Sequence, residues 1–287
     1  MARSLRRRAR VMVTYAKHPI PLEGVLSVPM DVREPNSIKK VLYSLKPDVT
    51  VYLGGSEDPA WVEANPKLAD RIFAAGPGDV LHATEIAGGR FLYVSTSNVF
   101  DGTKGNYEES DNISPTTLLG KLKASGETLV RGRSNSASVL RLSSLVGSAH
   151  PWRPSSFDRL RFALESETKT ELRDDEYHSW CSVSSAVEAI EDLIEKAPKN
   201  SLFHFGGLTR LTPLEMGRIF ARSLGYSEET IAKTLAPKKR VMQKGMIILP
   251  EGEKFDFSLN SSALVRAIGT KPVSIEYVVR REFEFKD

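Results

Sequence analysis

The stretch that decides the fold runs from Arg90 to Gly102 and reads RFLYVSTSNVFDG. Its first six residues are mostly apolar and include two aromatic side chains, a composition typical of a buried strand. Small and polar residues follow at once, beginning with Thr96. Because open parallel sheets bind ligands at the carboxyl ends of their strands, we expect a functional site directly after this strand.

Other parts of the chain have the same apolar, strand-like composition. Residues 10–15 (RVMVTY) have the composition of a buried strand, and further apolar, strand-like runs occupy 49–53 (VTVYL) and part of 138–147 (SVLRLSSLVG). Between them, apolar residues recur at helical spacing, in a helix that we expect Asn36 to cap and Pro47 to close, and in another that opens at Pro66. We expect residues 76–78 (GPG) to break that second helix. The alternation predicts an α/β fold with a Rossmann-like, doubly wound parallel sheet.

The alternation of strand-like and helical segments ends after residue 147, and this change suggests two domains. We expect residues 1–147 to form a nucleotide-binding domain, to which residues 180–205 return. Residues 148–179 and 206–287 would form a smaller α+β substrate-binding lobe, in which Thr212 and Glu215 have the spacing of a capping box. No internal repeat or low-complexity segment is visible.

Bulk composition narrows the class of protein. The chain has 287 residues, 40% of them hydrophobic and 26% charged, as in ordinary globular proteins. The net charge of +4 comes from arginines crowded before residue 11, not from a basic face, so we expect no nucleic-acid partner. No apolar run is long enough to cross a membrane, and the single cysteine, Cys181, fits a reducing compartment. We therefore expect a cytoplasmic protein with no membrane partner. Its five histidines lack metal-ligand spacing, so we expect no metal site.

The residues after the deciding strand carry a specific resemblance. Residues 95–102 (STSNVFDG) are followed by Leu119-Gly120 and Lys123, and then by Gly126-Glu127. This series resembles the extended short-chain dehydrogenase/reductase superfamily, and within it the dTDP-4-dehydrorhamnose reductases. The runs 61–66 (WVEANP), 203–207 (FHFGG) and 258–262 (SLNSS) also look like landmarks of that family. The resemblance therefore extends over nearly the whole chain from Arg10 onward.

The resemblance implies a chemistry and its residues. In such proteins NADP or NAD delivers hydride to the ketone of a nucleotide sugar, a hydroxyl binds the carbonyl oxygen, and a tyrosine donates the proton. By position, Thr96 is the hydroxyl, and Lys123 is the lysine that binds the ribose and assists the tyrosine. The tyrosine position holds Leu119, which has no proton to donate. A family asparagine that positions the lysine falls on Phe73.

The resemblance also implies binding residues, for which simpler roles stay open. Those for the cofactor are Asp31, Val32, Gly54, Gly55 and Lys123, and those for the sugar nucleotide are Ser97, Asn98, Val99, Tyr177 and Trp180. Asp31 could instead cap a turn, Gly54-Gly55 could be an ordinary turn, and Tyr177 and Trp180 could be core or loop aromatics. The family's first strand and glycine turn should precede RVMVTY, so we expect both to be missing from this sequence.

Two functions remain open at this point. The first is a reductase of the dTDP-4-dehydrorhamnose reductase type that lacks its usual proton donor. The second is a non-catalytic nucleotide-sugar-binding or regulatory subunit, resembling the β subunit of methionine adenosyltransferase. A homodimer and a complex with a partner subunit are both compatible with this resemblance.

Overall fold

The computed structural model describes residues 1–55, 58–147, 154–240 and 247–283. These residues form an α/β fold of two compact units, as the sequence predicts for the fold class. Unit 1 comprises residues 1–99, 115–141 and 190–203. Unit 2 comprises residues 100–114, 142–189 and 204–287. Which of them binds a nucleotide and which a substrate stays a prediction.

A parallel sheet organises unit 1. Its four strands are β3 (Val49–Tyr52), β4 (Arg90–Thr96), β5 (Ser138–Leu142) and β10 (Leu202–Phe205), in the order β10-β5-β4-β3. Strands β1 (Met12–Tyr15) and β2 (Leu26–Pro29) form a separate parallel pair. The predicted burial of residues 10–15 is wrong, because these side chains are half-buried or exposed. The reason is that β1 pairs with β2 and not with the central sheet.

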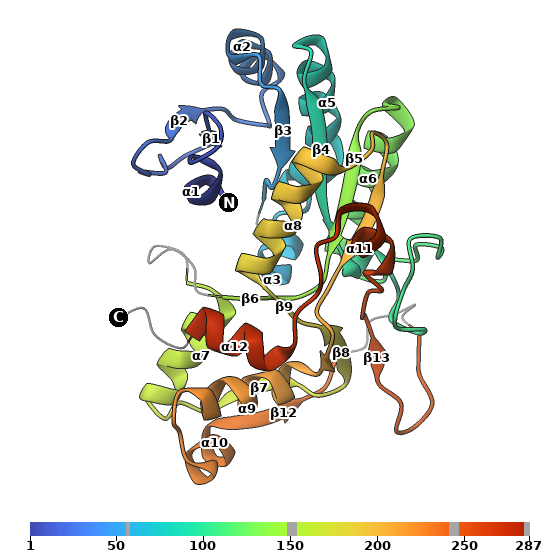
Figure 1. The fold of residues 1–287 in the computed structure, drawn as a ribbon. Helices are drawn as coiled ribbons and strands as arrows, with labels where there is room; N and C mark the ends of the chain where they lie inside the picture. Colours follow the sequence, from blue (N-terminus) through green and yellow to red (C-terminus); the bar gives the residue numbers. More distant parts are fainter. Residues whose placement is uncertain (56–57, 148–153, 241–246, 284–287) are drawn as a thin grey trace. The chain divides into compact units, whose positions relative to one another are not determined.

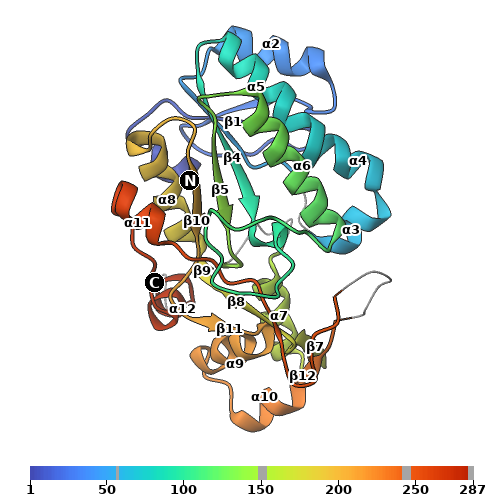
Figure 2. The same ribbon diagram turned by 90° about the vertical axis from the view of Figure 1, so that its right-hand side faces the viewer.

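Helices cover both faces of this sheet (Figures 1 and 2). On one face lie α2 (Pro35–Leu45), α5 (Gly76–Ile86) and α6 (Leu118–Arg133). On the other lies the second half of α8 (Val183–Lys196). The core between α2, α5 and the sheet contains fully buried apolar side chains, among them Ile38, Leu42, Val80, Leu81, Phe91 and Tyr93.

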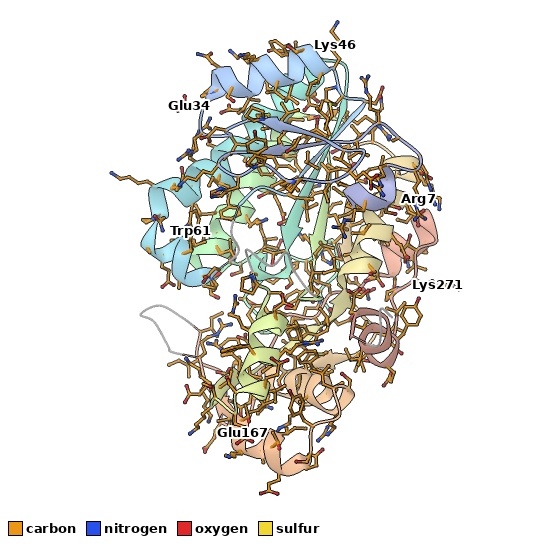
Figure 3. The ribbon with its side chains drawn as sticks, turned by 90° about the vertical axis from the view of Figure 1, so that its left-hand side faces the viewer. Arg7, Glu34, Lys46, Trp61, Glu167 and Lys271 are labelled. Atoms are coloured by element: carbon orange, nitrogen blue, oxygen red, sulfur yellow. The ribbon has the colours of Figure 1, made fainter. Side chains whose placement is uncertain are left out.

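The predicted start of α2 needs a correction. The helix begins at Pro35, and its N-cap residue is Glu34, whose side chain makes no capping hydrogen bond. Proline at the first helical position needs no N–H partner, which explains why the helix begins one residue before Asn36. Figure 3 shows Glu34 and Lys46 at the two ends of α2. Lys46 has a left-handed backbone (φ 45°) and ends the helix directly before Pro47.

Unit 1 also contains several short helical segments. They are α1 (Ala2–Leu5), α3 (Pro59–Ala64), which carries Trp61 (Figure 3), α4 (Pro66–Asp70), the π-helix η1 (Arg71–Ala75) and the 3-10 turn η2 (Ser97–Val99). The predicted break at residues 76–78 is wrong, because helix continues through α4, η1 and α5 without a gap. The helix accommodates Pro77 because the preceding turn, η1, is a wider π-helical turn.

Unit 2 is a mixture of short strands and helices. Its strand pairings are β11 (Arg210–Leu211) and β13 (Phe255–Asp256) on either side of β8 (Glu176–Ser179), β7 (Thr170–Arg173) with β12 (Leu235–Lys238), and β6 (Leu145–Val146) with β9 (Cys181–Ser182). Its helices are α7 (Ser156–Glu165), α9 (Pro213–Ser223), α10 (Glu228–Thr234), α11 (Ser262–Ile268) and α12 (Ile275–Phe283). The predicted capping box is confirmed: Thr212 Oγ1 accepts from Glu215 N, and Glu215 accepts from Thr212 N.

The structure also bears on membrane spans, metal sites and the single cysteine. Within the described ranges, no helix combines the length and apolar character that crossing a membrane requires. The same residues contain no cluster of three or more histidine, cysteine or acidic side chains able to hold a metal ion. Cys181 is fully buried, and this burial raises the pKa of its thiol to about 12. A thiol in that environment is a core residue and a poor nucleophile.

Candidate functional site

Thr96 is the last residue of β4 and lies at the predicted edge of the sheet. Its side chain is buried, and its Oγ1 accepts a hydrogen bond from the backbone N–H of Asn98 at 3.3 Å. This bond closes the turn η2, in which Ser97 and Val99 are buried and Asn98 is half-buried. In this structure the threonine hydroxyl therefore holds the loop that follows the strand.

Helix α6 packs directly on this turn because of a glycine. A Cβ atom at position 120 would lie 2.1 Å from the carbonyl oxygen of Asn98, which no larger residue tolerates. Thr117 begins the helix by accepting a hydrogen bond from Gly120 N at 3.1 Å. A Cβ at position 126 would similarly lie 2.3 Å from the carbonyl oxygen of Phe73. The glycines of the motif thus set how closely α6 approaches η2 and η1.

Lys123 is brought to the end of β4 by this packing, but its ammonium points into the protein. The residue is 3% exposed, and Nζ donates to the carbonyl oxygen of Val94 at 3.1 Å. The same atom lies 5.1 Å from the ring centroid of Phe73 and 5.6 Å from that of Tyr93, within cation–π range. The structure therefore brings Thr96 and Lys123 to the same strand end, with the lysine enclosed.

Leu119, at the predicted tyrosine position, is a core residue. It is 4% exposed and belongs to an apolar cluster that also contains Val62, Ala69, Phe73, Ala74 and Leu122. The Leu119 side chain is almost completely shielded from water and carries no ionisable group. The residues present therefore do not supply the proton-donating half of the chemistry that a nicotinamide cofactor would need.

Phe73, which falls on the family asparagine, is fixed beside Lys123 by an unusual helical turn. Pro77 has no N–H, so the carbonyl groups of Ile72 and Phe73 lose a helical donor. Two tyrosines of the sheet replace it: Tyr52 Oη donates to Ile72 O at 2.6 Å, and Tyr93 Oη donates to Phe73 O at 3.0 Å. The π-helix is therefore anchored to β3 and β4, and the Phe73 ring is held in place.

Glu127, the last residue of the motif, has a structural partner. Arg141 on β5 donates to its carboxylate through Nε at 3.0 and 3.1 Å and through Nη2 at 2.7 Å. Both side chains are 3% exposed. A bidentate pair of this geometry, out of water, ties α6 to the sheet and neutralises the charge of the Glu127 carboxylate.

The residues that we expect to bind the cofactor make contacts with neighbouring protein residues. Asp31 accepts from the backbone and side chain of Arg33, and this guanidinium holds the pKa of the Asp31 carboxyl below its ordinary value. Val32 is half-buried and packs on the core that contains α2. Gly55 has φ +112°, and a Cβ there would lie 2.3 Å from the Phe73 ring. Gly54 lies against Tyr52. Turn and packing roles account for these contacts, and cofactor binding stays a prediction.

The residues expected at the substrate in unit 2 also have defined surroundings. Tyr177 is half-buried, with the guanidinium of Arg210 4.8 Å and the ammonium of Lys254 5.3 Å from its ring centroid. Trp180 donates through Nε1 to the carbonyl oxygen of Leu211 at 2.8 Å and meets Phe157 edge to face at 6.0 Å. Trp180 thus packs against a core, whereas Tyr177 is half-buried and its ring contacts two cationic side chains.

Another tyrosine near the motif, Tyr107, is also occupied. Its hydroxyl donates to Asp101 at 2.8 Å and accepts from Lys104 N at 3.2 Å, and its ring stacks on Phe100 at 4.0 Å. Burial raises the pKa of this hydroxyl. Tyr107 belongs to unit 2 and Leu119 to unit 1.

Sequence reasoning missed several residues of this site. Tyr52, Tyr93 and Arg141 were placed in strands without a role, yet they hold Phe73 and Glu127 in position. One signal was available, because Pro77 within a helical pattern predicts carbonyl groups in need of other donors. The partner of Glu127 had no local signal, since Arg141 lies fourteen residues away in sequence.

The parallel sheet, the turn after β4 and the enclosed Lys123 define an α/β protein with polar residues at the carboxyl end of a central strand. A family profile described as "RmlD substrate binding domain" matches residues 2–242, and the chain belongs to this family. Among solved structures, dTDP-4-dehydrorhamnose reductase from Bacillus anthracis in complex with NADP superposes with a TM-score of 0.79 at 18% sequence identity, covering 96% of this chain and 98% of the other. At that identity the likeness concerns the fold.

Curated relatives have two kinds of description. Bovine (Bos taurus) "methionine adenosyltransferase 2 subunit beta" is 26% identical over 195 residues, which is 65% of this chain and 58% of the relative. A protein of Haloferax volcanii described as "Probable low-salt glycan biosynthesis reductase Agl14" is 25% identical over 203 residues, 68% of this chain and 66% of the relative. The match to the bovine protein thus spans little more than half of that relative's length. One relative is described as a subunit and the other as a reductase.

Proposed function

We propose that this chain is a non-catalytic nucleotide-sugar-binding or regulatory subunit built on the reductase fold. The observation that carries the proposal is Leu119, 4% exposed within an apolar cluster at the position where the family resemblance expects the proton-donating tyrosine. A positioned acid contributes about 10²–10⁴-fold to such a reaction, and leucine donates no proton at any pH. Its neighbours in this cluster are apolar and supply no titrating group in its place.

The environment of Lys123 supports the same proposal. Its ammonium is hydrogen-bonded to Val94 O and lies over two aromatic rings, so it faces the interior. A lysine that binds a ribose and assists a tyrosine must present its charge to a ligand. Similarity to a protein described as a subunit of methionine adenosyltransferase adds independent support, and a partner subunit for this chain is part of the proposal.

We assign the predicted binding residues to this proposal as follows. Unit 1 would hold NADP or NAD through Asp31, Val32, Gly54 and Gly55, and Ser97, Asn98 and Val99 of the same unit would contact the sugar nucleotide. For Tyr177 and Trp180 of unit 2, contact with a nucleotide sugar stays a separate prediction. A bound nicotinamide would supply hydride chemistry. The residues of this chain would then bind and orient the ligands without donating a proton.

A second candidate is a reductase of a 4-keto nucleotide sugar. It is favoured by the presence of both Thr96 and Lys123 at the end of β4, and by a relative described as a reductase. Proton delivery would have to come from water, because Leu119 has no acidic hydrogen. This candidate therefore predicts slow turnover and a rate that depends on the buffer.

One experiment separates the two candidates. The purified chain is titrated calorimetrically with NADPH, NADH and a dTDP-4-keto-6-deoxy sugar, and NADPH oxidation is then followed with the sugar present. We expect heat of binding from the nucleotide sugar and no oxidation above the rate without protein. Turnover at an ordinary enzyme rate, about 1–10³ per second, would refute the proposal. Absence of binding by all three compounds would refute its ligand-binding part.

A further inference from the structure

Lys123 lies in a small enclosure that we call the ammonium cage, formed by the Phe73 ring, the Tyr93 ring and the carbonyl oxygen of Val94. We infer that Phe73 is the positioning residue of this cage and keeps the Lys123 ammonium away from any ligand. The distances are 5.1 Å and 5.6 Å from Nζ to the two ring centroids, and 3.1 Å from Nζ to the oxygen. The inference concerns access to the lysine, so it does not depend on whether Leu119 abolishes turnover.

The chemistry of the cage suits a primary ammonium. Aromatic ring faces carry negative quadrupole density, and their attraction for a cation grows when water is excluded. Lys123 is 3% exposed and Phe73 and Tyr93 are fully buried, so the contact is made out of water. The carbonyl oxygen of Val94 accepts one N–H of the ammonium and so ties it to β4. The enclosure thus draws the side chain inward.

Phe73 is the part of the cage that decides whether it is closed. Its backbone is tied to β4 by the hydrogen bond from Tyr93 Oη to Phe73 O, and the next carbonyl back is tied to β3 by Tyr52. Gly55 gives the ring its space, because a Cβ at that position would lie 2.3 Å from the ring atoms. The backbone of Phe73 is therefore held from the helix side, and Gly55 leaves space for its ring on the side of β3.

This arrangement predicts what a ligand must do. A group that is to meet Lys123 has to displace the Phe73 ring or draw the ammonium out from between two ring faces. Phe73 is thus one wall of the enclosure that withholds the lysine, beside the Tyr93 ring and the Val94 carbonyl oxygen. Replacing the Phe73 side chain with a small polar one should release the ammonium while Leu119 stays as it is.

The test measures the reactivity of Lys123 directly. The folded protein is treated with trace acetic anhydride, and acetylation of Lys123 is compared by mass spectrometry with that of Lys121, an exposed lysine on the same helix. We expect Lys123 in the unmodified protein to react at least about 100-fold more slowly than Lys121. Phe73→Asn should raise the ratio of the two rates at least tenfold. Phe73→Trp, which keeps an aromatic face, should leave it low.

Two further variants keep the result interpretable. Phe91→Ala removes a ring of the same size from β4, in the core between the sheet, α2 and α5, and should leave the ratio unchanged. Phe73→Leu keeps an apolar side chain without a ring face and serves if Phe73→Asn does not fold. The inference is overturned if Lys123 already reacts within threefold of Lys121. It is equally overturned if the folded Phe73 variants leave the ratio unchanged, or if Phe91→Ala raises it as much as they do.

Discussion

Lys123 and Glu127 lie one turn apart on the same face of α6, yet they are buried in different ways. Glu127 meets the guanidinium of Arg141 in a bidentate pair, with both side chains 3% exposed. Lys123 meets a carbonyl oxygen and two ring faces. Both residues belong to the motif that identifies the family. Of these two motif residues, Glu127 is needed for the fold itself, whereas the role that the family resemblance implies for Lys123 is in ligand binding and catalysis.

The difference predicts opposite responses to substitution. Removing one member of a buried ion pair leaves the other charge desolvated and unpaired, which is strongly destabilising. Removing a buried ammonium that is held by rings and a carbonyl takes a desolvated charge away. If both residues were simply structural, their substitutions would cost similar amounts. The four predictions below test this contrast, beginning with the largest effect.

Glu127→Ala should cost about 3–5 kcal/mol of unfolding free energy, because Arg141 would remain buried without its carboxylate. The measurement is urea unfolding followed by circular dichroism. Glu63→Ala, at an exposed position on α3, is the control and should change stability by less than about 0.5 kcal/mol. Adding Arg141→Met to Glu127→Ala should recover much of the loss. A cost below about 1 kcal/mol for Glu127→Ala would mean that the pair does not hold α6 on the sheet.

Glu176 in unit 2 offers the same test with a pH dependence. Its carboxylate accepts from Arg240 at 2.7 Å and Arg173 at 3.0 Å, and it faces His178. Burial on its own raises the pKa of Glu176, but these neighbours outweigh it and the net pKa is well below the ordinary value of 4.5. The stabilisation from Glu176 is therefore fully present above about pH 4.5 and is lost as the pH falls toward the folded-state pKa.

Glu176→Gln should accordingly lower stability by about 2 kcal/mol at neutral pH, as expected for hydrogen bonds to a charged group. The difference from the unmodified protein should shrink as the pH is lowered below about 4.5. Urea titrations at several pH values measure it. Glu171→Gln is the control, since that carboxylate is 55% exposed and lies 3.9 Å from Lys238. A difference that grows on acidification would contradict the assigned sign.

Leu119→Tyr should cost about 1–3 kcal/mol, because the position is 4% exposed and a larger side chain overpacks its apolar cluster. Leu119→Met keeps nearly the same volume and should cost less than about 1.5 kcal/mol. Thermal unfolding of the three proteins measures both values. A tyrosine variant as stable as the unmodified protein would show that a cavity for the ring already exists, and would weaken the argument that Leu119 is core.

Much of this fold was predictable from local pattern. The run at 90–95 is strand β4, the run at 49–53 contains β3, and the helix through Ile38 and Leu42 packs on the sheet as its spacing indicates. These elements follow from periodicity and from burial of one helical face, which nearby residues determine. The family resemblance and the fold class are confirmed by the profile match and by the superposed reductase.

The site was predictable only in part. Thr96 and Lys123 do lie at one strand end, whereas Leu119 belongs to an apolar cluster, and the functional roles of all three stay predictions. The direction of the Lys123 ammonium was not predictable, because it depends on Phe73, fifty residues earlier in the chain. The position of Phe73 in turn depends on the π-helix η1, which precedes Pro77. In that π-helix, tyrosines of the sheet donate the hydrogen bonds that the Pro77 backbone cannot donate. Pro77 signals carbonyl groups that need other donors, but the contacts that supply those donors come from distant segments and cannot be read from helical periodicity.

Lys123→Met is expected to have the smallest effect and bears most directly on the comparison. Methionine is unbranched and flexible, so it can follow the path of the lysine side chain and contact Phe73 and Tyr93 through its thioether. The variant loses one hydrogen bond to Val94 O and the cation–π contacts, but it no longer has to desolvate a charge. These terms oppose each other, and we expect a net change within about 1 kcal/mol in either direction, against about 3–5 kcal/mol for Glu127→Ala. Urea unfolding of both variants beside the unmodified protein gives the two values. A loss for Lys123→Met as large as that for Glu127→Ala would erase the distinction, and would mean that the fold depends on the lysine as much as on the ion pair.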